Sequence, residues 1–151
     1  MSDTATVDYF RLFNEIGIIE QLSRNLLEAR LPPGFVQAQF SVLNHLVRVG
    51  DGRTPLALAR AFQVPKTSMT HSLAVLEREG LIEMRCNPRD GRSKLVHITA
   101  DGRSFLQSVI ASLAPDFDRM AAAVPPDLVA RLLPDLEVVR TFLDADRDRT
   151  A

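Results

Sequence analysis

A short cationic turn between two strand-like runs is the feature that most constrains how this chain can fold. The turn, residues 87–94, contains a proline and an Asp-Gly pair, which are typical of tight turns. It separates the runs 81–86 and 95–99, so the sequence predicts a β-hairpin. Like charges at a hairpin tip repel one another, and their presence indicates an anionic partner. The cationic side chains of the turn are Arg89, Arg92 and Lys94.

A helix-turn-helix pattern lies directly before the hairpin. Thr54 and Pro55 predict the start of a short helix, because threonine caps a helix and proline favours its first turn. We expect this helix over residues 56–62 and a second one over residues 66–79, which Gly80 ends in a left-handed conformation. This order of elements predicts a winged helix-turn-helix lobe, in a fold that is mainly α with one small β-hairpin.

The second predicted helix has one apolar and one polar face. Met69, Leu73 and Leu76 fall together at helical spacing and are expected to face the core. The opposite face carries short polar side chains and has no acidic residue in its first two turns, which suits a helix in a DNA major groove. An ordinary solvated face is the alternative. The residues of this helix expected to contact DNA are Lys66, Thr67, Ser68, Thr70 and His71, the last four as readers of the base sequence.

The charge of the chain is distributed unevenly along its length. The formal net charge of the 151 residues is −1, which is unusual for a DNA-binding protein. However, residues 48–103 hold ten Lys or Arg and six Asp or Glu, a net charge of +4, while the flanking residues carry −5. This asymmetry concentrates positive potential on the predicted lobe. The only two lysines, Lys66 and Lys94, lie in the two elements predicted to bind DNA.

Amphipathic helices are expected on both sides of the hairpin and its helices. Apolar residues recur there at steps of three and four. Because Pro134 lies inside the last of these patterns, we expect a kink or break there, followed by a charged, frayed tail over residues 144–151. The expected helices span residues 9–30, residues 35–49, a stretch from Asp101 up to Pro125-Pro126, and a stretch from Leu128 to Leu143.

Several segments resemble the MarR family of transcription regulators, and the resemblance covers nearly the whole chain. The segments are residues 66–73, residues 76–82, the wing tip Asp90-Gly91-Arg92, and residues 98–102. The resemblance implies a homodimer whose N- and C-terminal helices interlock, with ligand pockets between the dimer region and the DNA-binding lobe. We therefore expect residues 1–151 to form one domain, with the lobe over about 35–100 and dimerisation helices over about 5–30 and 101–147.

The apolar stripes of residues 10–30 and 105–143 support the dimer independently of the resemblance. They are long, have acidic neighbours and lie outside the predicted DNA-binding elements. The alternative is that these stripes pack on the lobe within a single chain. The helices expected to line the ligand pocket carry ring side chains. These are Phe10, Phe13, Phe35, Phe40 and His45.

Other kinds of site find little support in the sequence. No glycine-rich phosphate loop, paired carboxylates or Ser/His/Asp arrangement stands out, so neither an enzyme nor a cofactor is expected. His45, His71 and His97 fall on three different predicted elements without helical ligand spacing, so no metal site is expected. Cys86 lies beside Arg85 and could sense oxidants, but we expect this single strand cysteine to be a small core residue.

These features predict a dimeric winged helix-turn-helix transcription regulator that binds double-stranded DNA at a pseudo-palindromic operator. We expect a ligand-responsive repressor with a small aromatic or lipophilic effector. A single cysteine fits a reducing cytosol, and no apolar run suits a signal peptide or a membrane span, so we expect a cytoplasmic protein without membrane contact. The alternative function is a winged-helix protein-interaction module that never touches DNA.

Overall fold

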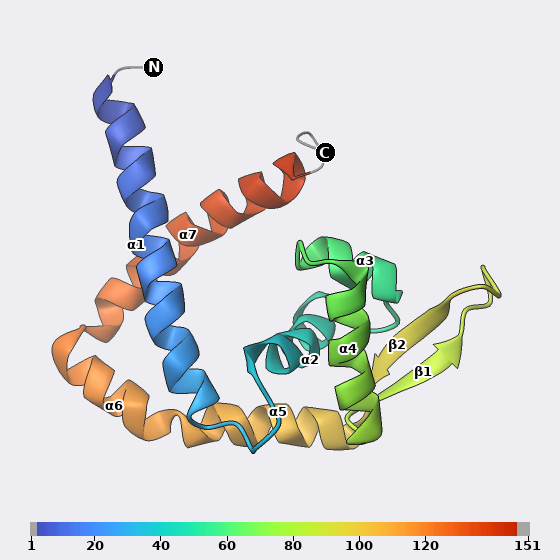
Figure 1. Cartoon of the computed structure of the whole chain (residues 1–151). Helices are drawn as coiled ribbons and strands as arrows, with labels where there is room; N and C mark the ends of the chain where they lie inside the picture. Colours follow the sequence, from blue (N-terminus) through green and yellow to red (C-terminus); the bar gives the residue numbers. More distant parts are fainter. Residues whose placement is uncertain (1–2, 148–151) are drawn as a thin grey trace. The chain divides into compact units, whose positions relative to one another are not determined.

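The computed structural model describes residues 3–147 and contains helices with one two-stranded antiparallel sheet (Figure 1). The chain divides between Leu113 and Ala114 into two compact units. The first unit holds α1 (Asp3–Glu28), α2 (Gln37–Val49), α3 (Pro55–Ala61), α4 (Lys66–Arg78), β1 (Ile82–Cys86), β2 (Lys94–Ile98) and α5 (Ala100–Ser112). The second unit holds α6 (Ala114–Ala123) and α7 (Pro126–Asp146).

The core of the first unit lies among α2, α3, α4, the hairpin and α5. Its most deeply buried side chains come from each of these elements, and partly buried phenylalanines pack around them. The apolar face predicted for residues 66–79 is confirmed, because Met69, Leu73 and Leu76 are all buried in this core. Burial of each such side chain stabilises the fold by roughly 1.5–3 kcal/mol. These three side chains therefore fix the rotation of α4 about its axis.

The predicted hairpin is confirmed. β1 pairs with β2 in antiparallel register, with Ile82 opposite Ile98 at its base and Cys86 opposite Lys94 near its tip. Burial decreases toward the tip, because the base packs on the core while the far end extends beyond it. An isolated bridge between Arg53 and Val96 adds a third short segment alongside β2.

A close approach of two backbones explains the residues that follow the hairpin. A Cβ at Gly102 would lie 2.1 Å from the carbonyl oxygen of Leu81, so only glycine fits there. Thr99 caps α5, since its hydroxyl accepts the Gly102 N–H at 3.0 Å and donates to the Gly80 carbonyl at 2.7 Å. Gly80 itself has a φ of +70°, the left-handed conformation predicted for it. These contacts lock α5 to the end of α4.

Three helix predictions are corrected. The helix predicted from Asp101 up to Pro125-Pro126 is two helices, α5 and α6, with a break at Leu113. Pro115 explains the break, because a proline lacks the amide hydrogen and clashes with the preceding turn. The first helix begins at Asp3 instead of Tyr9, since no residue in between opposes a helix. The start of the second moves from Phe35 to Gln37.

The last helix also differs from its prediction. Of the kink or break predicted at Pro134, the break is absent, because α7 continues through this residue. α7 also includes Asp144 and Asp146, which we expected in a frayed tail. A helix of 21 residues has enough hydrogen bonds on both sides to span the one that Pro134 removes. The remainder of that predicted tail, residues 148–151, lies outside the described residues. None of the helices described between residues 3 and 147 has the length and hydropathy needed to span a membrane.

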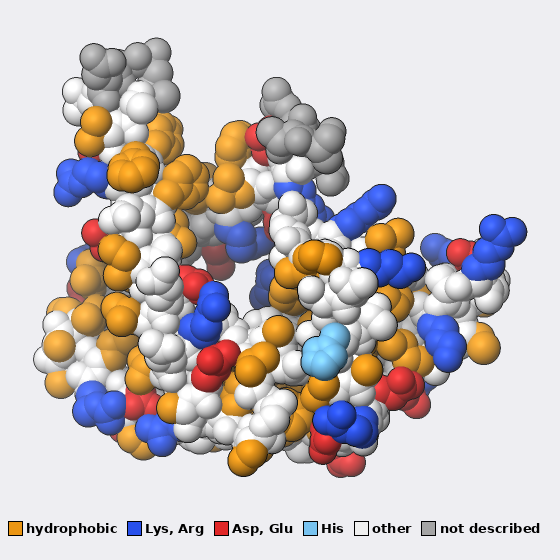
Figure 2. Space-filling view, in the orientation of Figure 1, with side chains coloured by type: hydrophobic (Ala, Val, Ile, Leu, Met, Phe, Trp, Pro, Cys, Tyr) orange, Lys and Arg blue, Asp and Glu red, His pale blue; other side chains and the backbone are white. Residues whose placement is uncertain are grey.

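Large apolar side chains remain exposed on the helices outside the core. Figure 2 shows them along α1, and no residue of α7 is buried along its described length. Ile19 and Leu22, for example, are 60% and 62% exposed. Exposed apolar residues that continue along a whole helix are typical of a surface covered by another chain. The α1 set comprises Val7, Tyr9, Phe10, Phe13, Ile16, Ile18, Ile19, Leu22 and Leu26, and the α7 set includes Leu132, Leu133, Leu136, Val138, Phe142 and Leu143.

Candidate nucleic-acid interface

The outward face of α4 carries the side chains predicted to meet DNA. Lys66, Thr67, Ser68, Thr70 and His71 are all exposed, whereas Met69 between them is buried. Pro65 occupies the N-cap and supplies no side-chain acceptor, and no acidic residue lies in the first turn. The first-turn amide groups and the positive end of the helix dipole therefore remain suited to an anion.

The hydroxyl group of Thr70 already donates a hydrogen bond within α4. Its Oγ1 donates to the backbone carbonyl of Lys66 at 2.8 Å, so the hydroxyl hydrogen is already used within the helix. The lone pairs of the oxygen stay free to accept. Toward a base edge, Thr70 is therefore an acceptor, which favours the exposed amino groups of adenine or cytosine in a major groove.

The wing tip is held in shape by its own side chains. Asn87 accepts the backbone N–H of Arg89 at 3.0 Å and donates to the Ser93 hydroxyl at 2.8 Å. Asp90 accepts the backbone N–H of Arg92 at 3.0 Å. Among the ion pairs between residues 3 and 147, none joins Asp90 to either arginine of the tip. The tip is thus held by hydrogen bonds of Asn87 and Asp90, and Arg89 and Arg92 are exposed. Figure 2 shows Lys and Arg side chains at the far end of the hairpin.

A hollow on the wing side of α4 brings the two predicted elements together. It has a volume of about 380 Å³ and lies among the start of α3, the start of α4 and the hairpin. Lys66 from α4 lines it together with Arg92 and Lys94 from the wing, while Asp90 is its only acidic residue. We call it the wing-side hollow. Lys66 and the wing cations Arg92 and Lys94, which are distant from it in the sequence, therefore converge on one concave surface, which has the shape and charge to hold a phosphate.

A second hollow lies on the other flank of α4, against the start of α2. It has a volume of about 540 Å³, and we call it the α2-side hollow. No Lys, Arg, Asp or Glu side chain lines it. Its lining residues are Gly34, Val36, Ala38, Gln39, Thr67, Ser68, His71, Ser72 and Val75.

The two hollows divide the predicted DNA-binding residues between them. Lys66, Arg92 and Lys94 line the wing-side hollow, and Thr67, Ser68 and His71 line the α2-side hollow. Thr70 and Arg89 line neither, which leaves Thr70 on the ridge of α4 between the two hollows. The sequence did not point to Thr54 and Ser93 on one side or to Gln39 and Ser72 on the other, because no local pattern shows that distant segments meet.

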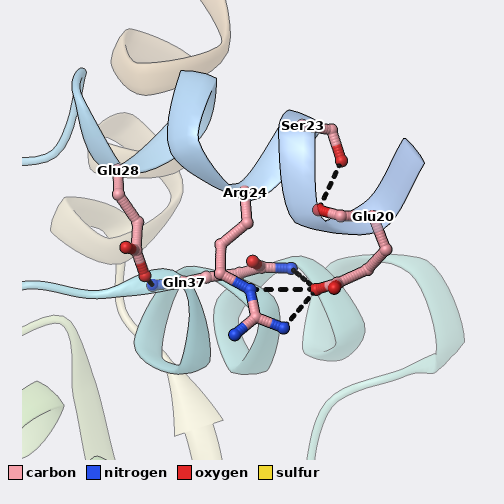
Figure 3. Close-up of polar contacts among 5 residues, drawn as sticks. All are labelled: Glu20, Ser23, Arg24, Glu28 and Gln37. Carbon is pink, nitrogen blue, oxygen red and sulfur yellow. Dashed lines mark hydrogen bonds and ion pairs between the residues drawn. The ribbon is translucent and has the colours of Figure 1, made fainter. Parts of the chain in front are cut away.

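A polar cluster joins α1 to the start of α2 (Figure 3). Glu28 accepts the backbone N–H of Gln37 at 2.9 Å, and so caps α2 from a different helix. One turn away, Arg24 donates two hydrogen bonds to Glu20, at 3.0 Å through Nε and at 2.5 Å through Nη2. These bonds and the negative charge of Glu20 raise the pKa of the Arg24 guanidinium above its ordinary value. The first turn of α2, which borders the α2-side hollow, is therefore tied to α1.

Cysteine and histidine residues form no reactive centre. The expectation that Cys86 is a core residue is wrong: it is exposed, because the hairpin has already extended past the core at that point. His97 lies 3.4 Å from Asp51, whose other carboxylate oxygen accepts the Ile98 N–H at 2.9 Å. The rings of His45 and Phe62 lie 5.2 Å apart between centroids in a tilted arrangement. Within residues 3–147, no three potential metal ligands cluster together.

Comparison with known proteins is consistent with this geometry. Residues 34–93, which contain the lining of the α2-side hollow, β1 and the turn that follows it, match the model of the MarR family. A curated relative, the transcriptional activatory protein BadR of Rhodopseudomonas palustris, is 31% identical over 97 residues. That match covers 63% of this chain and only 54% of the relative, so the chain matches about half of BadR's length.

Solved structures match over a longer stretch. A mutant of MarR from E. coli complexed with operator DNA is 27% identical, with a TM-score of 0.68 over 87% of this chain and 95% of that one. The transcriptional regulator BldR from Sulfolobus solfataricus has a TM-score of 0.75 over 93% of this chain and 99% of its own. At 24% identity, the BldR match shows a similar fold only.

Proposed function

We propose that the chain is a MarR-family regulator, a sequence-specific, double-stranded DNA-binding transcription regulator that acts as a homodimer. The observation that carries the proposal is the convergence of Lys66, Arg92 and Lys94 beside an exposed, short-chained helix face. The family consists of non-enzymatic DNA-binding regulators, so the protein is not an enzyme.

In this proposal α4 lies in a major groove and the wing contacts the neighbouring backbone. Arg89, Arg92 and Lys94 bind phosphates or enter the minor groove, and Lys66 binds a phosphate at the groove edge. Thr70, on the ridge of α4, meets the base edges, flanked by Thr67, Ser68 and His71. The E. coli MarR structure with operator DNA supports the proposal, because a similar chain there is complexed with DNA.

The homodimer follows from the exposed apolar faces of the terminal helices. We propose that the helices within about residues 5–30 and 101–147 dimerise, and that residues of about 35–100 form the DNA-binding lobe. A two-fold dimer would present two copies of α4 to half-sites about one helical turn, roughly 34–36 Å, apart on a pseudo-palindromic operator. Leaving the side chains of α1 in water would otherwise expose an unusually long apolar stripe.

The direct test of DNA binding is a fluorescence anisotropy titration of the whole chain with mixed-sequence duplex DNA at increasing salt. Binding that weakens steeply and linearly on a log–log plot supports the proposal, because phosphate contacts release counterions. A single strand of the same length serves as the comparison. Absence of duplex binding at low salt would favour the alternative, a winged-helix module that binds only proteins.

We propose repression as the regulatory outcome, since occupation of an operator is sufficient to exclude other proteins from it. The name of BadR, a transcriptional activatory protein, favours activation as the second possibility. A reporter with the bound DNA fragment placed over or upstream of a promoter, in a cell with and without this protein, distinguishes the two. We also propose that the protein acts in the cytoplasm, and regulation of a reporter located there would support this.

Control by a small aromatic or lipophilic effector completes the proposal. Of the aromatic candidates, Phe35 and Phe40 pack against the core, and Phe35 lies 5.0 Å from Phe105 between ring centroids. His45 is engaged with Phe62. Phe10 and Phe13 remain exposed and could meet either an effector or a second chain. A screen of aromatic acids and phenols against the protein–DNA complex tests for an effector: a compound that binds the protein must also shift DNA affinity.

A further inference from the structure

The turn between α2 and α3 is tied to the elements on both sides of it. The Arg53 guanidinium donates to the carbonyl oxygens of Val49 at 2.9 Å and Gly50 at 3.2 Å, at the end of α2. The backbone of the turn pairs with β2, since the Val96 N–H donates to the Arg53 carbonyl at 2.8 Å and the Gly52 N–H donates to the Val96 carbonyl at 3.0 Å. The turn therefore connects the hairpin, which forms the wing, to the end of α2.

Asp51 adds two side-chain contacts between this turn and β2. One carboxylate oxygen accepts the Ile98 N–H at 2.9 Å, and the other lies 3.4 Å from Nδ1 of His97. The imidazole lies against Gly52, where a Cβ would come within 3.2 Å of its Cε1 atom. The side chains of Asp51 and His97 are 31% and 21% exposed, so solvent screens their interaction only in part.

We infer that Asp51 and His97 form a pH-dependent latch that positions the wing for DNA. The inference rests on the proposed function, because it takes the hairpin to contact DNA. Histidine side chains gain a proton as the pH falls from about 8 to about 5. Protonation of His97 turns its contact with Asp51 into an ion pair, and loss of the proton removes the attraction between charges. The latch is therefore tightest at low pH and loosens as the pH rises.

Asp51 is the acidic partner of His97 among the elements that pack around β2. These elements are β1, α2 and α3, and α5 follows β2 directly in the chain. Their other acidic groups are Glu83, which stands opposite His97 in the register but pairs with Arg85, and Asp101 in the first turn of α5. In the described part of the chain, neither of these carboxylates forms an ion pair with His97. The remaining ionisable side chains on these elements and the turn are His45, Arg48, Arg53, Arg60, Arg85, Cys86, Lys94 and Arg103.

The latch predicts the opposite of what charge alone predicts. Removal of a carboxylate from a DNA-binding lobe reduces repulsion of phosphates, so electrostatics alone would tighten binding. Asp51→Asn removes this charge but keeps an oxygen that can accept the Ile98 N–H. We expect it to weaken duplex binding at low pH, because the wing is held less firmly. The matched control, Glu77→Gln, removes a carboxylate from an exposed position of α4 and should bind as tightly as the unaltered chain or more tightly.

A double-mutant cycle measured at two pH values tests the inference. The four proteins are the unaltered whole chain, Asp51→Asn, His97→Gln and the double variant, with circular dichroism to check that each is folded. Their affinities for one mixed-sequence duplex are measured by fluorescence anisotropy at about pH 5.5 and about pH 8.5. We expect the two changes to be coupled by up to about fivefold for each lobe at the lower pH and to be nearly independent at the higher. Titration of His71 affects all four proteins alike and cancels from the coupling.

The outcomes that contradict the inference differ from those that contradict the proposed function. Equal coupling at both pH values would make the contact purely structural, and tighter binding by Asp51→Asn at low pH would show that charge alone decides. The same cycle in urea unfolding measures the latch without DNA. Coupling in unfolding but none in DNA affinity would show that the latch does not position the wing. If the unaltered chain binds no duplex at either pH, the proposed function itself fails.

Discussion

Removing both wing arginines should flatten the salt dependence of DNA binding far more than it damages the fold. Arg89 and Arg92 are exposed and form no ion pair within residues 3–147, and the tip is held by their backbone N–H groups, which donate to the side chains of Asn87 and Asp90. Arg89→Ala combined with Arg92→Ala therefore removes charge and leaves the hairpin intact. In a dimer, four phosphate contacts would disappear, which reduces the salt slope by up to about 3.6 units.

The size of this effect makes it easy to measure. The slopes of the two proteins should differ by about 3.6. Between about 50 and 200 mM salt, the affinity of the unaltered chain should therefore fall by roughly two decades more than that of the double variant. The assay is an anisotropy titration at four or more salt concentrations, with circular dichroism to check that the variant is folded.

The matched control removes two arginines outside the candidate interface. Arg11 and Arg131 lie on α1 and α7, with side chains 77% and 69% exposed. Arg11→Ala with Arg131→Ala changes the net charge by the same amount but should leave the slope unchanged. Equal slopes for the wing variant and the unaltered chain would refute the assignment of the wing to DNA. Equal flattening in both double variants would show that net charge, and not the wing, sets the slope.

Three further predictions address other parts of the account. Thr70→Val should cost roughly 1–3 kcal/mol on the preferred operator and relax preference at one base position, as measured by competition among single-base variants; a uniform loss across sequences would make Thr70 a backbone contact. Gly102→Ala should destabilise the fold by about 1–3 kcal/mol or more in urea unfolding, because the new Cβ meets the Leu81 carbonyl, whereas Gly91→Ala, with nothing within 4 Å, should be nearly neutral. Ile19→Glu with Leu22→Glu should convert the dimer to monomer in light scattering and weaken operator binding; a dimer of unchanged stability would place the interface elsewhere.

Local patterns predicted the elements that carry the candidate interface. The spacing of Met69, Leu73 and Leu76 identified the buried face of α4, and so also the outward face, because the helical period leaves little freedom once three large apolar residues are buried. The left-handed conformation of Gly80 and the hairpin around the Asp-Gly turn followed from residue preferences alone. These are short-range effects, in which the residues concerned are neighbours along the chain.

The errors arose where apolar periodicity masked another signal. The steps from Phe105 through Leu113 to Phe117 suggested one long helix, although Pro115 could have been read as a break. Cys86 continued the alternation of β1 but lies beyond the edge of the core, and the sequence does not state where the core ends. The case of Cys86 shows that a pattern of apolar residues predicts which side of an element would be buried, but not whether anything covers it.

The hollows could not be predicted because they depend on contacts between distant segments. Lys66 meets Arg92 and Lys94 only after the hairpin has packed beside α4. Gln39 and Ser72 come together only where the start of α2 approaches α4, and neither residue type is a conspicuous DNA ligand. The charge asymmetry of residues 48–103 indicated the lobe that we propose to bind DNA, but the position of a hollow on each flank of α4 required the tertiary structure.

Selection of bound sequences from a pool of randomised duplexes by the whole chain tests the central claim most directly. The account predicts enrichment of an inverted repeat whose half-sites are centred about one helical turn, roughly 10 base pairs, apart, and whose conserved positions lose information in the Thr70→Val variant. Enrichment of no sequence, or of a single unrepeated half-site, would contradict a homodimer that reads its operator through two copies of α4.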